Sequence, residues 1–178
     1  MDYELVRSRR KSLAVSVEDG RVIVRSPLWM PRRLIDAFVA RHSEWIDERL
    51  ARHRELAGRY YLLGELHSAN GVDVEAAWRR VMEDMVVPRA WEMAKELGFA
   101  PKAIRISRAK RRWGSCSAKG NINLSLRLAQ LPPSLIDYVI LHELCHLHHH
   151  DHSKAFWALV ERHMGDYKER REALRRFW

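Results

Sequence analysis

The sequence has few cysteines and no long apolar run. Cys116 and Cys145 are the only cysteines among its 178 residues. Two cysteines are too few for a disulfide framework and are typical of a reducing compartment. No apolar run approaches the roughly 20 residues that a membrane-spanning helix needs. The first residues, Met1 to Glu4, also lack the apolar centre of a signal peptide. We therefore expect a cytoplasmic protein without a membrane association, and no obligate protein partner is evident.

Acidic residues are absent from a long stretch in the second half of the chain. Residues 97–136 contain no Asp or Glu, whereas the whole chain has 32 Lys and Arg against 23 Asp and Glu, a net charge of +9. The basic residues of this stretch are Lys102, Arg105, Arg108, Lys110, Arg111, Arg112, Lys119 and Arg127. Such a run is most often a solvated face, but next to a catalytic site it favours a polyanionic substrate. Nucleic acid is one partner that the basic segment 102–127 would suit.

The residues that carry chemistry lie just after this stretch, where His142 to His146 read H-E-x-x-H. On a helix, residues four apart share one face, so His142 and His146 can direct ring nitrogens at one ion. Glu143 lies about 100° further round the helix, where it can take a proton from water on the metal. This is the pattern of zinc hydrolases. The neighbouring residues are apolar, which predicts a buried helix, and buried His and Glu are costly unless paired or metal-bound.

A catalytic zinc site needs a third protein ligand. His150 is eight residues beyond His142, a rise of about 12 Å along a straight helix, so one ion cannot easily bind both. We prefer His152, because Asp151 or Ser153 can cap a new helix there and so turn the chain round. The alternative third ligands are His149, His150 and Glu161. A purely structural zinc site is the rival explanation, but it usually has four protein ligands and would give Glu143 no purpose.

Two blocks of sequence surround the motif. The first comprises residues 137–147, His152-Ser153 and Phe156-Trp157, and the second comprises residues 112–117, 120–124 and 127–128. Together they resemble the YgjP-like metal-dependent hydrolases, small bacterial proteins related to the SprT and WLM zinc peptidases. The resemblance implies one zinc ion per chain on His142, His146 and His152, with Glu143 as the base. Asp151, where the family usually has Asn, and a short segment at residues 69–78 depart from the family pattern.

The expected fold class is α+β. The resemblance implies a zincin-like catalytic domain at residues 71–178, with the active-site helix beside a small antiparallel sheet. An N-terminal β-hairpin/helix subdomain is expected at residues 1–70, because Asp19-Gly20 lies between two alternating runs and is a strong hairpin signal. Further expected elements are helices at 31–56 and 74–97, the latter kinked or broken at Pro88, strands at 104–107 and 121–126, and an ordered loop at 111–117.

We predict a zinc-dependent hydrolase in which Glu143 activates water for attack on a peptide or phosphoanhydride bond. The resemblance leaves two alternatives, a UTP pyrophosphatase that releases UMP and pyrophosphate, and a nucleic-acid-associated protease like the SprT relatives. The substrate is then a polypeptide or a nucleoside triphosphate. By analogy with zincins, the strand at 121–126 is expected to line the cleft. The residues expected to contact substrate are Lys110, Arg111, Arg112, Asn121 and Asn123. Stabilisation of the developing anion is expected from Arg112, Lys110 or a nearby histidine such as His148.

Overall fold

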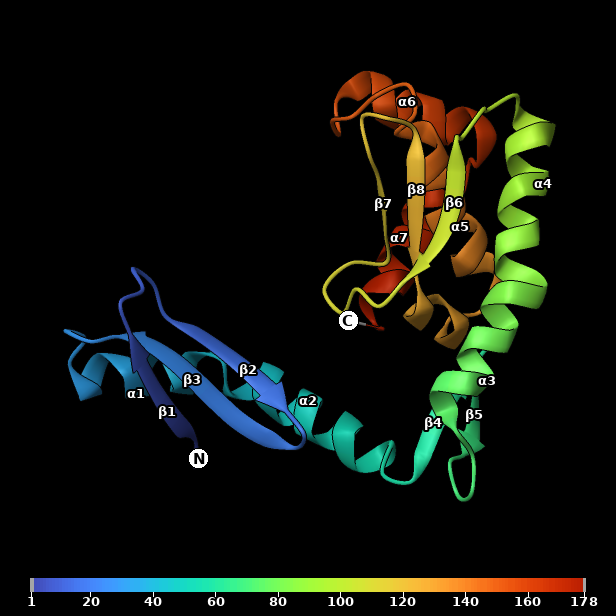
Figure 1. The fold of residues 1–178 in the computed structure, drawn as a ribbon. Coiled ribbons are helices and arrows are strands. Elements are labelled where there is room, and N and C mark those ends of the chain that lie inside the picture. Colours follow the sequence, from blue (N-terminus) through green and yellow to red (C-terminus); the bar gives the residue numbers. More distant parts are fainter. Residues whose placement is uncertain (1, 178) are drawn as a thin grey trace. The chain divides into compact units, whose positions relative to one another are not determined.

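The chain folds into two units, each with its own hydrophobic core. The computed structural model describes residues 2–177 and has one unit over Met1–Arg59 and a second over Tyr60–Trp178 (Figure 1). The sequence places the boundary at residue 70, after a second hairpin. In the structure this hairpin belongs to the second unit, because the N–H groups of Leu63 and Gly64 donate to the carbonyls of Ala129 and Gln130, at 2.8 and 3.1 Å.

The first unit is a three-stranded sheet with two helices. Its strands are β1 (Glu4–Ser8), β2 (Ala14–Glu18) and β3 (Arg21–Pro27), in the order β1-β3-β2. The predicted hairpin is confirmed, since β2 and β3 pair antiparallel and Asp19 and Gly20 both have the positive φ of the favoured hairpin turns, 49° and 75°. The hydrophobic core of this unit consists of Val22, Val24, Ile35, Val39 and Ile46.

The single helix expected at 31–56 is two helices, α1 (Arg32–Arg41) and α2 (Ser43–Glu55). His42 leaves the helical conformation at φ −106° and ψ 13°, and its Nδ1 atom lies 2.8 Å from the carbonyl oxygen of Phe38. The prediction of one helix is wrong, because the apolar spacing on which it rests continues across the break.

The second unit begins with the hairpin β4 (Arg59–Leu62) and β5 (Glu65–Ser68), followed by α3 (Val74–Val81), a π-helical segment (Met82–Val86) and α4 (Val87–Leu97). Pro88 lies in the first turn of α4, where its missing N–H costs least. The wider π turn directly before it accommodates the proline without ending the helical path. Gly98 then ends α4 in the left-handed conformation at φ 75°, as expected.

The sheet of the second unit is mixed. Its strands are β6 (Ala103–Ser107), β7 (Gly114–Cys116) and β8 (Asn121–Ser125), in the order β6-β8-β7. The expected antiparallel pairing holds for β7 and β8 but is wrong for β6 and β8, which pair parallel. The expected loop at 111–117 contains the short edge strand β7, and β8 is the central strand. Residues 126–130 form a short 3₁₀ helix, so the strand ends at Ser125, one residue before its expected end.

The central element of this unit is α5 (Pro133–Cys145), which packs against α4, β7, β8, α6 (Lys154–His163) and α7 (Tyr167–Arg175) (Figure 1). Pro133 lies in its first turn, as expected. The helix is buried on nearly all sides, which confirms the prediction from its apolar composition. None of the helices within residues 2–177 is long and apolar enough to cross a membrane.

Candidate metal centre

A tight turn after α5 brings the third histidine back beside the first two. His146 is the residue that ends α5, and the chain reverses over the next five residues. Asp151 Oδ1 accepts a hydrogen bond from the N–H of Ser153 at 3.3 Å, and Ser153 Oγ caps α6 by accepting from the N–H of Phe156 at 3.4 Å. The expected turn with a cap at this position is therefore present.

The ring nitrogens of the three histidines converge. His142 Nε2 lies 3.2 Å from His146 Nε2 and 3.1 Å from His152 Nε2. The three ligand atoms all lie within 4.8 Å of one another. A tetrahedral zinc ion with Zn–N bonds of about 2.0–2.1 Å places two ligand nitrogens about 3.4 Å apart. The two short separations match this value closely, so the histidines fit a metal ion of that size.

The environment of His142 and His146 favours neutral rings with a free nitrogen lone pair. Burial and the neighbouring rings lower the pKa of His142 to about 3, and burial lowers the pKa of His146 as well. His146 Nδ1 lies 2.8 Å from the carbonyl oxygen of His149. A carbonyl only accepts, so the ring proton is on Nδ1 and the lone pair is on Nε2, toward the cluster.

Two aromatic residues of α6 hold the rings in place. The Phe156 ring is fully buried and stacks on His146 at 4.5 Å between centroids, with edge contacts to His142 and His152 at 4.9 and 5.0 Å. Trp157 stacks on the exposed His152 at 5.6 Å. These contacts restrict the imidazoles to their convergent orientation, which is the support that a metal site requires.

Glu143 is the buried carboxylate of the site, 5% exposed. Burial raises its pKa to about 8, while the positive charge of Arg112 acts in the opposite direction. Its Oε2 atom and Nδ1 of His142 are buried and have no hydrogen-bond partner among residues 2–177. Buried polar atoms are nearly always satisfied, so these two atoms indicate a place where water or a ligand binds.

The backbone of β7 passes directly against this carboxylate. A Cβ atom on Gly114 would lie 2.6 Å from Cγ and 2.7 Å from Oε1 of Glu143. No side chain fits in that space, so the glycine allows the strand to approach the buried carboxylate. The sequence motif R-W-G-S-C-S contains this glycine, but the contact joins residues far apart in the chain and has no local signal.

A cavity of about 220 Å³, here called the metal-side cavity, opens beside His142 and Glu143. Its wall is formed by Trp113, Tyr138, Val139 and Leu174, and the side chains of Arg111 and Arg112 complete the lining. Tyr138 was missed at the sequence level, although it lies four residues before His142 on the same helix face. Leu174 comes from α7, and no sequence signal connects that helix with the motif.

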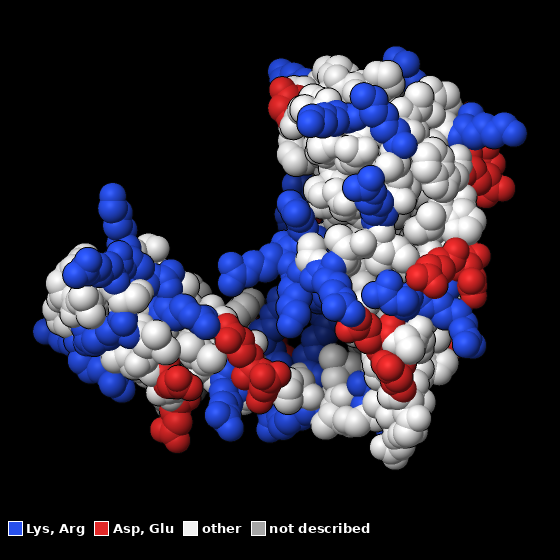
Figure 2. Space-filling view, viewed as in Figure 1, with Lys and Arg blue, Asp and Glu red and all other residues white. Residues whose placement is uncertain are grey.

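The expected substrate contacts are distributed over several places. Arg111 and Arg112 line the metal-side cavity, on the loop between β6 and β7 where Lys and Arg side chains gather (Figure 2). Lys110 lines a neighbouring, larger cavity. Asn121 and Asn123 lie on β8, whose backbone pairs with both β6 and β7. The strand beside α5 that has an open edge is therefore β7 and not the expected strand at 121–126.

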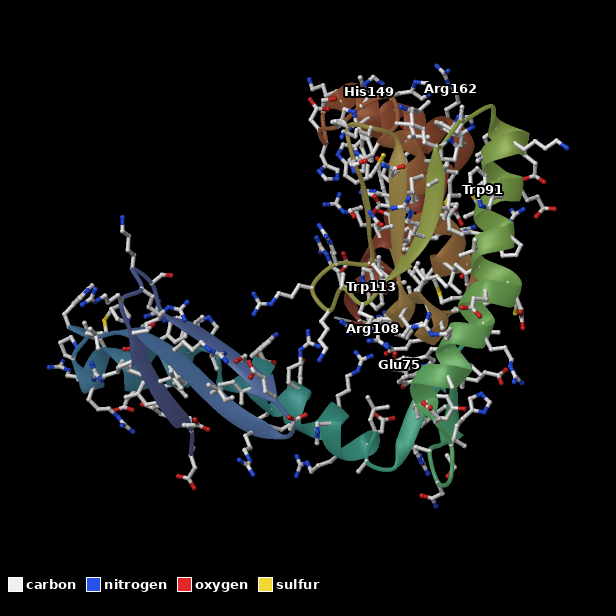
Figure 3. The ribbon with its side chains drawn as sticks, in the orientation of Figure 1. Glu75, Trp91, Arg108, Trp113, His149 and Arg162 are labelled. Atoms are coloured by element: carbon white, nitrogen blue, oxygen red, sulfur yellow. The ribbon has the colours of Figure 1, made fainter. Side chains whose placement is uncertain are left out.

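The alternative ligands lie outside the histidine cluster. His149 contributes its carbonyl oxygen to His146, His150 is exposed, and Glu161 pairs with Lys168 at 3.5 Å. Figure 3 shows His149 at the top of the second unit and Trp113 nearer its middle. His148, an expected oxyanion donor, packs against the ring of Phe99 at 5.3 Å. Of the three residues expected to stabilise the developing anion, Arg112 is the one that lines the metal-side cavity.

Comparison with known proteins identifies the family. The family described as "YgjP-like, metallopeptidase domain" matches residues 11–81 and 68–177. Among solved structures, the metallopeptidase zymogen abylysin of Pyrococcus abyssi is similar, with 29% identity and a TM-score of 0.45 over 51% of this chain and 91% of that chain. No curated protein sequence matches. Because the family match covers most of the sequence, the chain belongs to the YgjP-like family of metallopeptidase domains, and this membership implies a bound metal ion.

Proposed function

We propose that the protein is a zinc-dependent peptidase that holds one zinc ion on His142, His146 and His152 and uses Glu143 as its general base. The observation that carries the proposal is the convergence of three ring nitrogens next to a buried carboxylate with an unpartnered oxygen. A structural zinc site would need neither this carboxylate nor the cavity beside it. When bound, the ion supplies Lewis-acid chemistry, which lowers the pKa of water and polarises the bond under attack.

The residues of the chain have separate tasks in this reaction. Glu143 accepts a proton from the attacking water and returns it to the leaving nitrogen. Gly114 leaves room for that carboxylate. Arg112 lines the same cavity and carries the positive charge that stabilises the developing anion. The open edge of β7 offers backbone groups to an extended peptide.

Hydrolysis of a nucleoside triphosphate such as UTP is the second candidate. It is favoured by Arg111 and Arg112, because two guanidinium groups at the metal-side cavity match the charge of a triphosphate. The reaction would use the same Glu143 as base and would release UMP and pyrophosphate from UTP.

One experiment tests both candidates. Zinc-loaded protein and its Glu143→Gln variant, with equal zinc content measured, are incubated with an unfolded protein substrate and with a panel of nucleoside triphosphates. The peptidase proposal expects new peptide fragments from the wild-type protein and none from the variant. Pyrophosphate release that depends on Glu143, without any peptide fragments, would replace the peptidase by the nucleotide hydrolase.

A further inference from the structure

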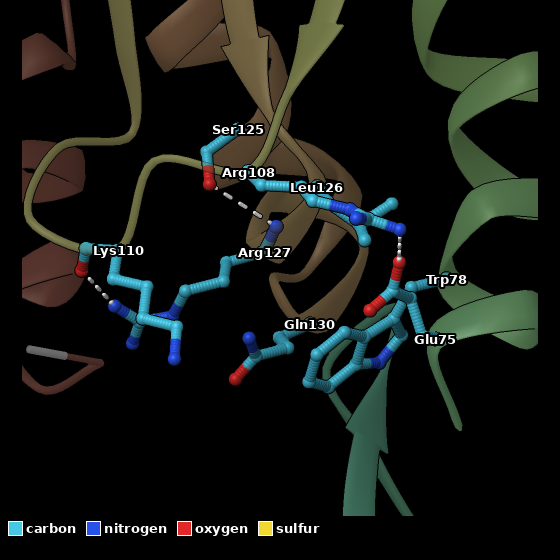
Figure 4. A pocket seen from close by; sticks show the side chains of 8 residues that line it. All are labelled: Glu75, Trp78, Arg108, Lys110, Ser125, Leu126, Arg127 and Gln130. Carbon is cyan, nitrogen blue, oxygen red and sulfur yellow. Dashed lines mark hydrogen bonds and ion pairs between the residues drawn. The ribbon is translucent and has the colours of Figure 1, made fainter. Parts of the chain in front are cut away.

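A second cavity, here called the basic cavity, lies next to the metal-side cavity and has a volume of about 400 Å³. Its lining combines three basic side chains with an indole ring, an amide and one carboxylate, which belong to Arg108, Lys110, Arg127, Trp78, Gln130 and Glu75 (Figure 4). No role in the proposed reaction has been given to these groups, apart from the expectation that Lys110 contacts substrate.

The basic side chains of this cavity are held by different contacts. Arg108 forms an ion pair with Glu75, and a guanidinium nitrogen of Arg127 donates to the carbonyl oxygen of Lys110 at 2.7 Å. These two contacts lie on opposite sides of the cavity in Figure 4. The ammonium group of Lys110 makes neither a hydrogen bond nor an ion pair within residues 2–177. Lys110 therefore offers a cation that is available to a ligand.

The other walls are rigid and partly apolar. The indole N–H of Trp78 donates to the carbonyl oxygen of Tyr61 at 2.9 Å, which fixes the ring with part of its surface on the cavity. The side-chain amide of Gln130 has no hydrogen-bond partner among the described residues. The cavity thus presents an aromatic surface, an amide and a cation to one ligand.

The two cavities share the loop between β6 and β7. Lys110 lines the basic cavity and the next residue, Arg111, lines the metal-side cavity, and consecutive Cα atoms are about 3.8 Å apart. Arg127 lines the basic cavity and lies over the ring of Trp113, 4.9 Å from its centroid, on the metal side. Trp113, Arg108 and Glu75 follow one another from the sheet toward α3 in Figure 3. The two cavities are therefore neighbours, lined by adjacent residues of one loop.

We infer that the basic cavity binds an acidic segment of the polypeptide substrate, with a carboxylate on Lys110 and Arg127 and an aromatic or aliphatic side chain on Trp78. This inference rests on the peptidase function proposed above and names its substrate class, polypeptides with acidic residues close to the cleaved bond. The Glu75 carboxylate on Arg108 shows how a carboxylate sits in this cavity. The same carboxylate repels a polyphosphate, with its several charges, more strongly than a single side-chain carboxylate, which favours isolated side-chain anions over a nucleic-acid backbone.

Binding to the zinc-loaded, full-length Glu143→Gln variant tests this inference without cleavage. The probes are a short fluorescein-labelled peptide with the sequence Glu-Phe-Glu in a Gly-Ser background, the same peptide with Gln-Phe-Gln, and labelled oligothymidylate. At low salt the acidic peptide should bind about 25-fold more tightly than the neutral one, which corresponds to two exposed ion pairs at the upper end of their range. This preference should shrink as salt is added.

Two further substitutions assign the effect to the cavity. Lys110→Met should weaken binding of the acidic peptide about five-fold, the loss of one such pair, and should leave the neutral peptide unchanged. Lys119→Met is the matched control, because Lys119 is an equally exposed lysine of the acid-free stretch that lines neither cavity. It should change neither affinity.

Several results would overturn the inference. Equal affinities for the acidic and neutral peptides, or equal losses from both lysine substitutions, would show that the cavity does not select the acidic peptide. Tighter binding of oligothymidylate with a loss in Lys110→Met would assign the cavity to nucleic acid. Failure of the peptidase proposal looks different, because wild-type protein would then cleave none of the peptides while the Glu143→Gln variant still preferred the acidic one.

Discussion

A Cβ atom at position 114 would lie 2.6 Å from Cγ of Glu143, so the backbone of β7 and the buried carboxylate occupy adjoining space that only a glycine leaves free. The contact involves the methylene carbon Cγ at 2.6 Å, the carboxylate carbon Cδ at 2.8 Å and the oxygen Oε1 at 2.7 Å. Since Glu143 lies on the rigid, buried helix α5, it cannot move aside without a change in its rotamer. Gly114 therefore positions the proposed base.

Gly114→Ala should displace this carboxylate. We expect kcat to fall by about 10²-fold, the size of effect that small misplacements of catalytic groups produce. Zinc content should be unchanged, because the atoms nearest to the added Cβ all belong to Glu143 and not to a histidine. Peptide cleavage and elemental analysis of the same sample measure the two quantities. Ser115→Ala, one residue further along β7, is the matched control and should retain activity. An alanine variant with unaltered kcat would show that Gly114 has no positioning role.

The third ligand is tested by a pair of histidine substitutions. His152→Ala should lose most of its zinc, because it removes a ring nitrogen that lies 3.1 Å from His142 Nε2. His149→Ala should keep its zinc, because His149 supports His146 through its backbone carbonyl, which the substitution retains. The zinc content of both variants is measured by elemental analysis after dialysis against a weak chelator. Full zinc content in His152→Ala would transfer the third ligand to His149, His150 or Glu161.

Much of this site follows from local sequence pattern, and the remainder depends on contacts between distant segments. The helix with His142 and Glu143, and the turn capped at Ser153, have local signals in apolar spacing and capping residues. The approach of Gly114 has none, because it depends on which strand lies beside α5. The parallel pairing of β6 and β8 is likewise a long-range event, which side-chain alternation along one strand does not determine.

The same distinction explains the errors in the first half of the chain. Apolar spacing from Pro31 to Leu56 continues through His42, so periodicity alone predicts one helix. The break coincides with a contact between His42 Nδ1 and the Phe38 carbonyl oxygen, which the apolar spacing does not reveal. In α5, by contrast, Tyr138 was within reach of sequence reasoning, because a residue four before His142 shares its face.

The two cysteines should differ from ordinary exposed thiols in their reaction with iodoacetamide. Burial raises the pKa of Cys145 to about 12 and also raises the pKa of the half-buried Cys116, where the negative charge of Glu143 adds to the effect. A raised pKa means less thiolate at neutral pH, and the thiolate is the reactive form. Mass spectrometry of the native protein should therefore show slow modification of Cys116, faster as pH rises, and none of Cys145.

Denatured protein is the control for this experiment, since both thiols should then react at the rate of a free cysteine. Rapid modification of Cys145 in the native protein would contradict the packing of α5 described above. It would mean that the helix with His142 and Glu143 opens to solvent on the time scale of the reaction.

The coordination of zinc is the most direct test of the central claim. X-ray absorption spectroscopy of the zinc-loaded protein should show histidine nitrogen ligands at about 2.0–2.1 Å, completed by a light atom from solvent, and no sulfur at about 2.3 Å. In His146→Ala, the histidine contribution to that spectrum should fall from three ligands to two. A sulfur ligand, or a shell complete with four protein ligands, would contradict the three-histidine site and would make the zinc structural.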